Sequence, residues 1–412
     1  MTDACDVLVV GAGLAGLQCA RELQAAGRQV LVWEASDDIG GRIRTDRIDG
    51  FLVDRGFQVL NPSYPAVRRW VDVGALALQS FGAGLRVRGP DSIAVLAHPL
   101  REPALILQTL RSGLLDPRSV AGLLRWAGPA FTGHRRHPGS DVPLRAALDR
   151  AGCSGGLRRA VDQFLAGVLL DDEGTTSNDF ALQLVRVFAT GVQGLPRDGM
   201  QALPRQLADT LITPVRTSTR VESITPDGDG AVVTAAGARL RARHVVLAAD
   251  PVNSARLTGG EVPAMKGVLT HWFAADTAPS AVDMLHIDGR AHPGGPLVNA
   301  AVISNAAPSY APAGRHLVQT SALRVPGRPI PSDDDVLRHA ADLFGSSTSG
   351  WELVARHDVP HALPLQRPPL RPQPVEGPSG LVICGDHRET ASINGALFSG
   401  HRAALAILGR PR

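Results

Sequence analysis

The chain has 412 residues, of which 44% are hydrophobic and 20% charged, a composition typical of folded proteins with room for two or more packed units. The net charge of +3 and the scattered basic residues argue against a nucleic-acid surface. No apolar run approaches the roughly 18 residues of a membrane span. An apolar strand already begins near Val7, which leaves no room for a leader, and the four cysteines show neither paired nor metal-type spacing. We therefore expect a cytoplasmic protein without a metal site.

The first predicted elements form a strand, a helix and a second strand. Residues 7–10 are β-rich, and the glycine motif GAGLAG follows them directly, at residues 11–16. Helical periodicity then runs to Gly27, and a second apolar strand at 30–33 leads to Glu34. This order of elements is typical of a Rossmann-like dinucleotide site.

Each residue of the motif has a physical role in binding a dinucleotide. Gly11 permits the tight turn, Gly13 lets backbone N–H groups approach a diphosphate, and Gly16 lets the helix pack closely on the strand. The N-terminus of the helix adds positive partial charge. Glu34 is placed to accept hydrogen bonds from ribose hydroxyls, and its charge disfavours a 2′-phosphate, so we do not expect NADP here.

A second glycine motif separates the candidate cofactors. The stretch SDDIGGRIRTDRIDGFLVDRGFQVL contains Gly41 and Arg42 just beyond Glu34. Here the sequence resembles the superfamily of flavin amine oxidases and phytoene desaturases. The resemblance implies FAD, with Gly41 and Arg42 approaching its diphosphate. It also implies that the backbone around Gly56 and Phe57 lies along the flavin.

Residues 85–193 are helical in pattern, with Asp116 as the expected N-cap and Pro117 at the first helical position. Their leucine positions favour a core; a lipophilic tunnel, or a patch in peripheral contact with a membrane, is the alternative. The glycines of FGAGLRVRG precede a β-rich tail rather than a helix, so we interpret them as a turn. Without a second dinucleotide site, electrons are expected to leave to O₂ or another acceptor.

The middle of the chain alternates between the two predicted units. The segment from 194 resembles the return of superfamily chains to the FAD domain, and Val221 is implied to meet the adenine. A strand is expected at 244–249 and two more at 267–275 and 316–325. A proline-rich connector then leads back to the FAD domain.

The C-terminal motif, GLVICGDHRETASINGALFSG, reads as a strand, a turn and a helix capped by Ser392 or Thr390. In the superfamily, the matching Gly-Asp places its carboxylate near the FAD ribitol and diphosphate, which implies these roles for Gly385 and Asp386. The following helix is implied to point its N-terminus at the flavin pyrimidine, through the backbone of Ile393, Gly395 and Ala396. No cysteine or histidine lies where these motifs would attach a flavin covalently, so we expect non-covalent FAD.

Together these elements predict an α/β fold with a Rossmann-like FAD-binding domain built from discontinuous segments and a mixed helix–sheet substrate domain. The FAD-binding domain is expected at 1–84, 194–260 and 375–412, and the substrate domain at 85–193 (helical part) and 261–374 (sheet part).

The substrate side offers one candidate catalytic residue, Lys266, which is the only lysine in the chain. Amine oxidases of the superfamily use a lysine to hold a water at flavin N5, and Lys266 begins a strand that resembles the lysine-bearing one. The candidate pocket residues are Gln58, His271, Trp272, Ile393 and Phe398. His271 and Trp272 alternate along a strand, so at most one of them should face the pocket.

These motifs predict an FAD-dependent oxidoreductase that removes a hydride equivalent from a C–H bond of a small organic or lipophilic substrate. Two versions remain open, an amine-oxidase-like enzyme and a desaturase or dehydrogenase. Amine oxidases of the superfamily typically have aromatic residues on both sides of the substrate amine. This chain has only two tyrosines, Tyr64 and Tyr310, and neither lies in the C-terminal motif, so it matches that feature poorly. A carotenoid-type isomerase and a non-catalytic flavoprotein are the further alternatives.

Overall fold

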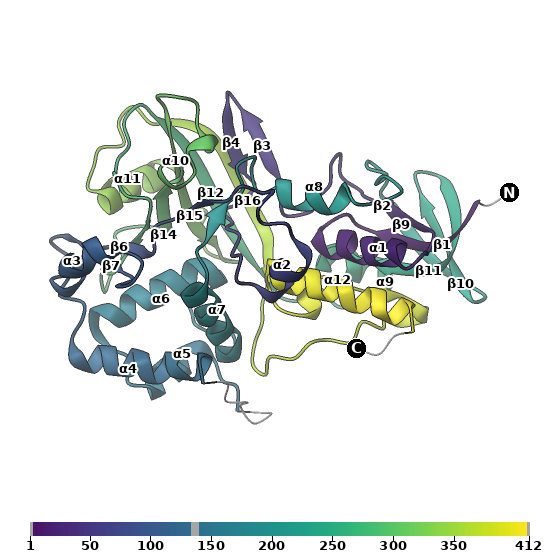
Figure 1. The fold of residues 1–412 in the computed structure, drawn as a ribbon, viewed down its shortest axis with the longest axis horizontal. Coiled ribbons are helices and arrows are strands. Elements are labelled where there is room, and N and C mark those ends of the chain that lie inside the picture. The colour runs from purple at the N-terminus through teal and green to yellow at the C-terminus, as the bar shows by residue number, and fades with distance from the viewer. Residues whose placement is uncertain (1–2, 133–139, 410–412) are drawn as a thin grey trace.

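The computed structural model describes residues 3–132 and 140–409 and builds them around two large β-sheets (Figure 1). A six-stranded sheet lies at the right of Figure 1 beside the N-terminus, and a seven-stranded sheet lies at the left. Each sheet takes strands from segments far apart in the sequence. The fold is thus α/β, with a Rossmann-like part and a mixed helix–sheet part, as predicted.

The six-stranded sheet has the order β2-β1-β11-β10-β9, and β17 pairs with β11. Strand β1 is parallel to both β2 and β11, whereas β9 and β10 add an antiparallel edge. The predicted strand at 244–249 is the end of a longer strand that stops at Leu247. The six strands are β1 (Asp3–Val10), β2 (Val30–Trp33), β9 (Val221–Asp227), β10 (Gly230–Ala235), β11 (Ala238–Leu247) and β17 (Val382–Ile383).

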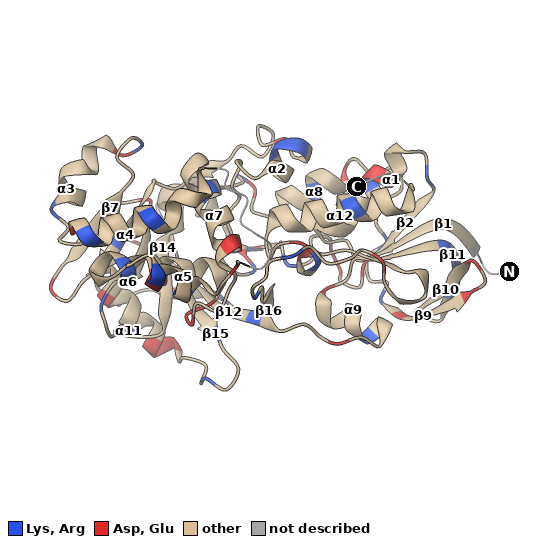
Figure 2. Cartoon of the chain, turned by 90° about the horizontal axis from the view of Figure 1, so that it is seen from below, with Lys and Arg blue, Asp and Glu red and all other residues tan. Residues whose placement is uncertain are grey.

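Helices cover both faces of this sheet (Figure 2). Helix α1 (Leu14–Ala25) packs beside α12 (Ile393–Ile407) and α8 (Ala202–Ala208) on one face, and α9 (Pro251–Thr258) lies on the other. Along α1, the periodic apolar side chains of Leu14, Leu17 and Leu23 are at most 5% exposed. Burying each leucine stabilises the packing by about 1.5–3 kcal/mol, which holds the N-terminus of α1 fixed against the sheet.

The seven-stranded sheet has the order β16-β12-β15-β14-β13-β6-β7. Helix α11 (Asp333–Phe344) packs on one of its faces and α6 (Gly155–Leu169) on the other. Its central strands are therefore buried on both faces, and they bury polar side chains such as His271, Asn299 and Gln319 among the apolar ones. The seven strands are β6 (Gly84–Arg88), β7 (Ile93–Ala97), β12 (Met265–Ala275), β13 (Leu285–Asp288), β14 (Leu297–Val302), β15 (His316–Arg324) and β16 (Glu352–Pro364).

A group of helices closes the lower left of Figure 1. Asp116 caps α4 (Pro117–Ala127) as expected, because its Oδ1 accepts a hydrogen bond of 2.9 Å from the N–H of Ser119. The segment 85–193 is not helical throughout: its start forms β6 and β7, whose alternating pattern buries Val87 and Val95. The helices of this group are α3 (Ile106–Leu110), α4 (Pro117–Ala127), α5 (Leu144–Arg150), α6 and α7 (Asn178–Thr190).

Short elements complete the described part of the chain. They are the helices α2 (Pro65–Trp70) and α10 (Ile303–Ala306), the strand pairs β3 (Thr45–Ile48) with β4 (Phe51–Asp54) and β5 (Gln79–Ser80) with β8 (Gly194–Leu195), and single 3₁₀ turns at Pro103–Leu105, Gly128–Ala130, Pro308–Tyr310, Pro378–Gly380 and Asp386–Arg388.

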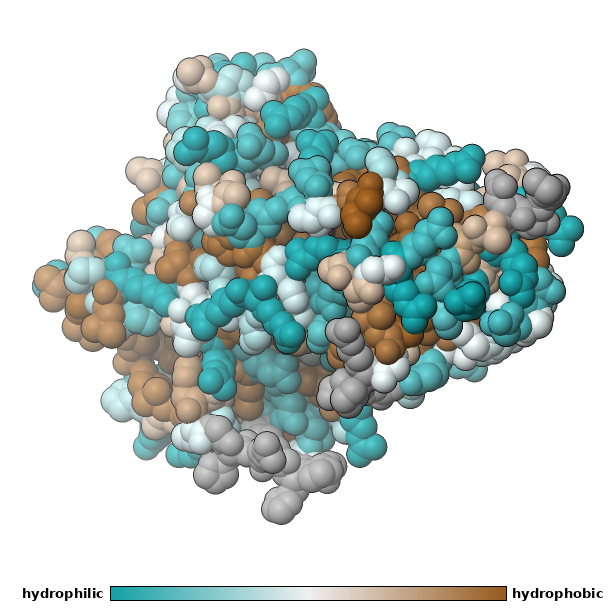
Figure 3. Space-filling view, turned by 45° about the vertical axis from the view of Figure 1, so that its right-hand side comes forward, coloured by the Kyte–Doolittle hydropathy of each residue, from teal (hydrophilic) through white to brown (hydrophobic). Residues whose placement is uncertain are grey.

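Hydrophobic side chains also reach the surface in places. Figure 3 shows an apolar group at the protruding left end, where Figure 1 places α3. Leu107 and Leu110 of this helix are 63% and 65% exposed. Among the described residues, no helix combines the length and the apolar character needed to cross a membrane.

Candidate active site

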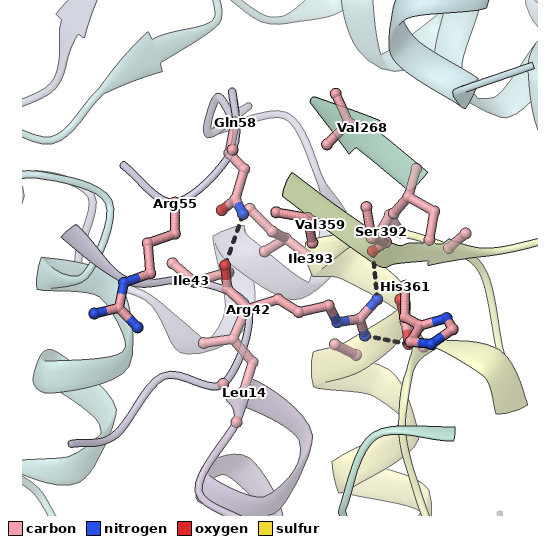
Figure 4. Close-up of a pocket in the computed structure, with 18 of the residues that line it drawn as sticks. Leu14, Arg42, Ile43, Arg55, Gln58, Val268, Val359, His361, Ser392 and Ile393 are labelled. Atoms are coloured by element: carbon pink, nitrogen blue, oxygen red, sulfur yellow. Dashed lines mark hydrogen bonds and ion pairs between the residues drawn. The ribbon is translucent and has the colours of Figure 1, made fainter. Parts of the chain in front are cut away.

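One large cavity runs between the two sheets and has a volume of about 960 Å³. This lies at the upper end of the range of about 300–1,000 Å³ for ligand sites. Its wall joins segments that are hundreds of residues apart. In Figure 4, Leu14 and Arg42 from the N-terminal part face Ser392 and Ile393 at the start of α12, with Gln58 and Val268 above them.

The glycine motif has the geometry of a diphosphate cradle. Gly11 has a φ of +108°, and a Cβ there would lie 2.7 Å from the carbonyl oxygen of Ala248. At Gly16 a Cβ would lie 2.0 Å from the Gly11 oxygen, so this residue lies behind the wall and serves helix packing. At Gly13, by contrast, a Cβ would meet nothing within 4 Å. No side chain caps α1, whose first N–H groups therefore face an open space suited to an anion.

Glu34 lies on the wall of the cavity beside this cradle and is 7% exposed. Its Oε2 accepts a hydrogen bond of 2.7 Å from the N–H of Ala12, and its Oε1 accepts two from Ser36. A carboxylate has about four acceptor positions, so it can accept a further donor such as a ribose hydroxyl. Val221 also lines this end of the cavity, and its carbonyl oxygen accepts from Arg256.

Arg42 joins the N-terminal and C-terminal motifs across the cavity. Its Nη2 donates to Asp386 Oδ1 at 2.6 Å, and its Nη1 donates to the carbonyl oxygen of Ala362 at 2.6 Å. Gln58 donates to the carbonyl oxygen of Arg42 at 2.8 Å, while its own Oε1 is buried without a partner among the described residues (Figure 4). A buried acceptor without a partner suits a ligand that brings a donor.

Helix α12 begins at the cavity wall, as expected. Its N-cap is Ser392 rather than Thr390, because the Ser392 Oγ accepts from the N–H of Gly395 at 3.0 Å. The N–H of Ala396 donates to the Ser392 carbonyl oxygen. The N–H groups left at the helix start are therefore those of Ile393 and Asn394, and not the whole of 393–396.

The glycines and charged residues assigned to the cofactor from the sequence thus meet around one space. Those that line the cavity are Gly11, Gly13, Glu34, Gly41, Arg42, Gly56, Phe57, Val221, Gly385, Asp386, Ile393 and Ala396. Gly16 and Gly395 lie behind the wall, where a Cβ at either would lie 2.0 Å from a backbone oxygen. Their role is close packing of the two helix starts.

The cavity continues beyond these residues into what we call the far arm. Its wall combines Phe164 and Val168 of α6 and Leu184 and Phe188 of α7 with residues of β6, β13, β14 and β15 and of the turn after β7. Of the residues that we assign to it, His98 and Arg101 are the titratable ones. The far arm is lined by residues 81–85, His98, Arg101, Phe164, Gly167, Val168, Leu170, Leu184, Phe188, Gln193, Leu285, Ile287, Asn299 and Ser321.

Lys266 does not lie on the wall of the cavity, in contrast to our expectation. Its Nζ is 3.0 Å from Asp171 Oδ2, 2.6 Å from Thr176 Oγ1 and 3.3 Å from the carbonyl oxygen of Leu169. These three contacts occupy the three N–H groups of an ammonium. Burial lowers the pKa of Lys266, with the charge of Asp171 opposing the shift. The side chain therefore ties β12 to the end of α6, behind the cavity wall.

The other pocket candidates divide in the same way. Gln58 and Ile393 line the cavity, whereas His271, Trp272 and Phe398 do not. His271 faces α11, where its Nε2 lies 3.1 Å from Asp333 Oδ1. Trp272 is fully buried in the core between the sheets, and Phe398 packs edge-on against Trp70 at a centroid distance of 5.1 Å. Because both faces of this sheet are covered, alternation along β12 buries both His271 and Trp272.

Sequence reasoning missed the residues that shape the far arm. Phe164 and Phe188 come from helices whose periodicity is the same for a core and for a cavity wall, and they pack edge-on at 5.5 Å. Arg101 belongs to a chain in which almost every basic residue is an arginine, so nothing in its local sequence marks it.

Comparison with known proteins agrees with this geometry. The family model described as flavin containing amine oxidoreductase matches residues 14–408. A coproporphyrinogen III oxidase of Propionibacterium freudenreichii is 30% identical over 174 residues, which is 40% of this chain and 32% of that protein. A putrescine oxidase of Kocuria rosea is 35% identical over 133 residues, 30% of this chain and 28% of that protein. The matches thus span about a third or less of these relatives.

Solved structures share the fold over the whole chain. A putative protoporphyrinogen oxidase from Exiguobacterium sp. 255-15 superposes with a TM-score of 0.76 at 16% identity, covering 100% of both chains.

Proposed function

The chain belongs to the flavin containing amine oxidoreductase family, and from that premise we propose that it is an FAD-dependent dehydrogenase that removes a hydride equivalent from a C–H bond of a lipophilic substrate. The observation that carries the choice of substrate class is the wall of the far arm. The acidic residues of the whole described wall are Glu34, Asp250, Asp358 and Asp386, and none of them lies in the far arm.

This distribution of charge disfavours a diamine. An ammonium group in a buried site needs a carboxylate or an aromatic cage to offset its lost hydration. Asp386 pairs with Arg42, and Asp358 faces Arg324 at 3.4 Å. The remaining two, Glu34 and Asp250, lie at the end of the cavity beside the glycine motif. A cation in the far arm would therefore have no acidic partner there. An apolar substrate, in contrast, gains from burial against leucine and phenylalanine side chains.

The residues of the chain bind and orient, while bound FAD supplies the hydride acceptor. The start of α1 would provide positive partial charge for a diphosphate, and Arg42, paired with Asp386, borders the same cavity. The free N–H groups of Ile393 and Asn394 and the dipole of α12 favour negative charge at that helix start. Burial raises the pKa of Tyr64, which lines the cavity, to about 12. Its phenol stays protonated at neutral pH and is no base, so the proton that the substrate loses together with the hydride would pass to water.

A screen for anaerobic bleaching of the flavin tests this proposal. We expect lipophilic compounds with an activated C–H bond to bleach the oxidised flavin and putrescine to leave it unchanged. Chemical reduction of the same sample serves as the control that the flavin is reducible. Bleaching by putrescine alone would instead establish an amine oxidase, and no bleaching by any compound would favour a flavoprotein without catalysis.

The attachment of the flavin gives a second test. No cysteine of the described residues lines the cavity. We propose non-covalent FAD, so acid denaturation followed by centrifugation should leave the flavin in the supernatant. Flavin that stays with the precipitated protein through washing would contradict this.

A further inference from the structure

The far arm contains three neighbouring side chains whose hydrogen-bond donors are only partly used by protein groups. Arg101, His98 and Gln193 all line it, and they come from the turn after β7 and the turn after α7. The two turns are joined by Arg101 itself. Its Nη1 donates to the carbonyl oxygen of Gly191 at 2.8 Å, and its Nη2 donates to that of Ala189 at 2.9 Å.

These two bonds fix the position of the guanidinium group but do not use all of its N–H donors. A guanidinium has five N–H donors, so three remain. No carboxylate of the described residues forms an ion pair with Arg101. The acidic neighbours lie off the wall: Glu102 accepts from the N–H of Ala83 at 3.0 Å, and Asp283 lies behind Gly82. Arg101 therefore presents a positive charge to the far arm without a counter-ion on the wall.

The two neighbouring side chains add donors of the same kind. The Nε2 of Gln193 is buried without a hydrogen-bond partner among the described residues. The Nδ1 of His98 accepts from the N–H of Leu100 at 3.3 Å, so the hydrogen of a neutral imidazole lies on Nε2. A buried donor without an acceptor costs about 1–3 kcal/mol, a cost that a ligand bringing an acceptor would remove.

We infer that the far arm binds an apolar molecule through an anionic end group, a carboxylate, held by Arg101 with Gln193 and His98. This inference rests on the proposed function, because it names the substrate class of the same cavity. The apolar body of the molecule packs against the phenylalanine and leucine walls, and the carboxylate accepts from the guanidinium, which is the strongest donor for that group. Fixing the end group fixes which carbon of the chain reaches the flavin.

Binding of three matched ten-carbon probes tests the inference. Decanoate, methyl decanoate and decylamine are titrated into the oxidised holoenzyme, and dissociation constants are read from the perturbation of the flavin spectrum. We expect decanoate to bind at least about tenfold more tightly than the ester and the amine to bind most weakly. Arg101→Gln should remove the preference for decanoate over the ester, and Arg101→Lys should retain part of it.

Two further variants separate binding from folding. Arg101 also caps α7, so its replacement could disturb the fold. Gln193→Leu breaks no protein hydrogen bond of the side chain, and it should weaken the binding of decanoate several-fold while the affinity for the ester stays unchanged. Arg111→Gln, at the exposed end of α3 and off the wall, should change neither. Equal affinity of the wild type for decanoate and its ester would overturn the inference. So would an equal loss of decanoate affinity in Arg111→Gln and Arg101→Gln. The titration measures binding without turnover. Decanoate binding that depends on Arg101 can therefore be observed even if no compound bleaches the flavin, and bleaching can be observed even if decanoate binding does not depend on Arg101.

Discussion

Replacing Gly13 with valine is expected to abolish flavin binding while the apoprotein remains folded. Gly13 has extended backbone angles, φ −75° and ψ 176°, which any residue adopts, and a Cβ there meets no protein atom within 4 Å. The added side chain would occupy the space in front of the α1 N-terminus, where we propose that the diphosphate binds. We expect at least about a 100-fold loss of FAD affinity, equal to about 2.7 kcal/mol. Losing glycine at the N-cap costs the helix only about 1 kcal/mol.

Gly16→Val is the matched comparison for this variant. Its Cβ would lie 2.0 Å from the backbone oxygen of Gly11, so this variant should lose folded structure as well as FAD. Circular dichroism and thermal unfolding of the two apoproteins, with flavin titrations of each, measure the difference. A Gly13→Val protein that binds FAD normally would show that the diphosphate does not occupy this cradle.

Lys266→Met is expected to destabilise the fold by about 3–5 kcal/mol and to leave flavin reduction nearly unchanged. The side chains of Lys266 and Asp171 are 11% and 5% exposed, so losing the lysine leaves a buried carboxylate without its counter-ion. Chemical denaturation of the holoenzyme measures the loss. In the double variant Lys266→Met/Asp171→Leu, much of the stability should return, because no charge remains buried.

The same ion pair carries a pH signature. Burial opposes ionisation of Asp171, but hydrogen bonds from Thr176 and the charge of Lys266 outweigh it and lower the pKa of Asp171 to about 2. A carboxyl with a lowered pKa in the folded state stabilises the fold above its unfolded pKa of about 4. This contribution is lost as the pH falls from about 4 towards 2.

An exposed ion pair gives the control for Lys266. Arg328 and Asp172 are 2.7 Å apart with side chains 49% and 36% exposed, so Arg328→Gln should cost less than about 1 kcal/mol. If Lys266→Met instead slowed flavin reduction or reoxidation at least about tenfold without loss of stability, the lysine would act on the flavin after all.

The cofactor half of the site was predictable because its constraints are local. Gly11 must adopt a positive φ, Gly16 must let a helix approach, and Glu34 must follow the second strand. Each requirement fixes the residue type at one position of the motif. The strand and helix periods around them are equally local. The C-terminal helix could be placed by its cap and its apolar spacing in the same way.

The substrate half was not predictable to the same degree because its constraints are long-range. Lys266 begins a strand as expected, but its partner Asp171 lies at the end of a helix in another part of the sequence. Whether Lys266 reaches the cavity or ties two elements together depends on how α6 packs on the sheet. The apolar residues of α6 and α7 have the same period whether they face a core or a ligand, so the far arm emerges only from the packing.

The central claim is that a lipophilic substrate loses hydride to the flavin within this one cavity. Its most direct test is a single anaerobic turnover carried to product analysis. For each mole of flavin reduced, we predict one mole of product that has lost two hydrogens, one passed to the flavin as hydride and the other released to water as a proton. A rearranged product with unchanged hydrogen content and oxidised flavin would contradict the claim and indicate an isomerase.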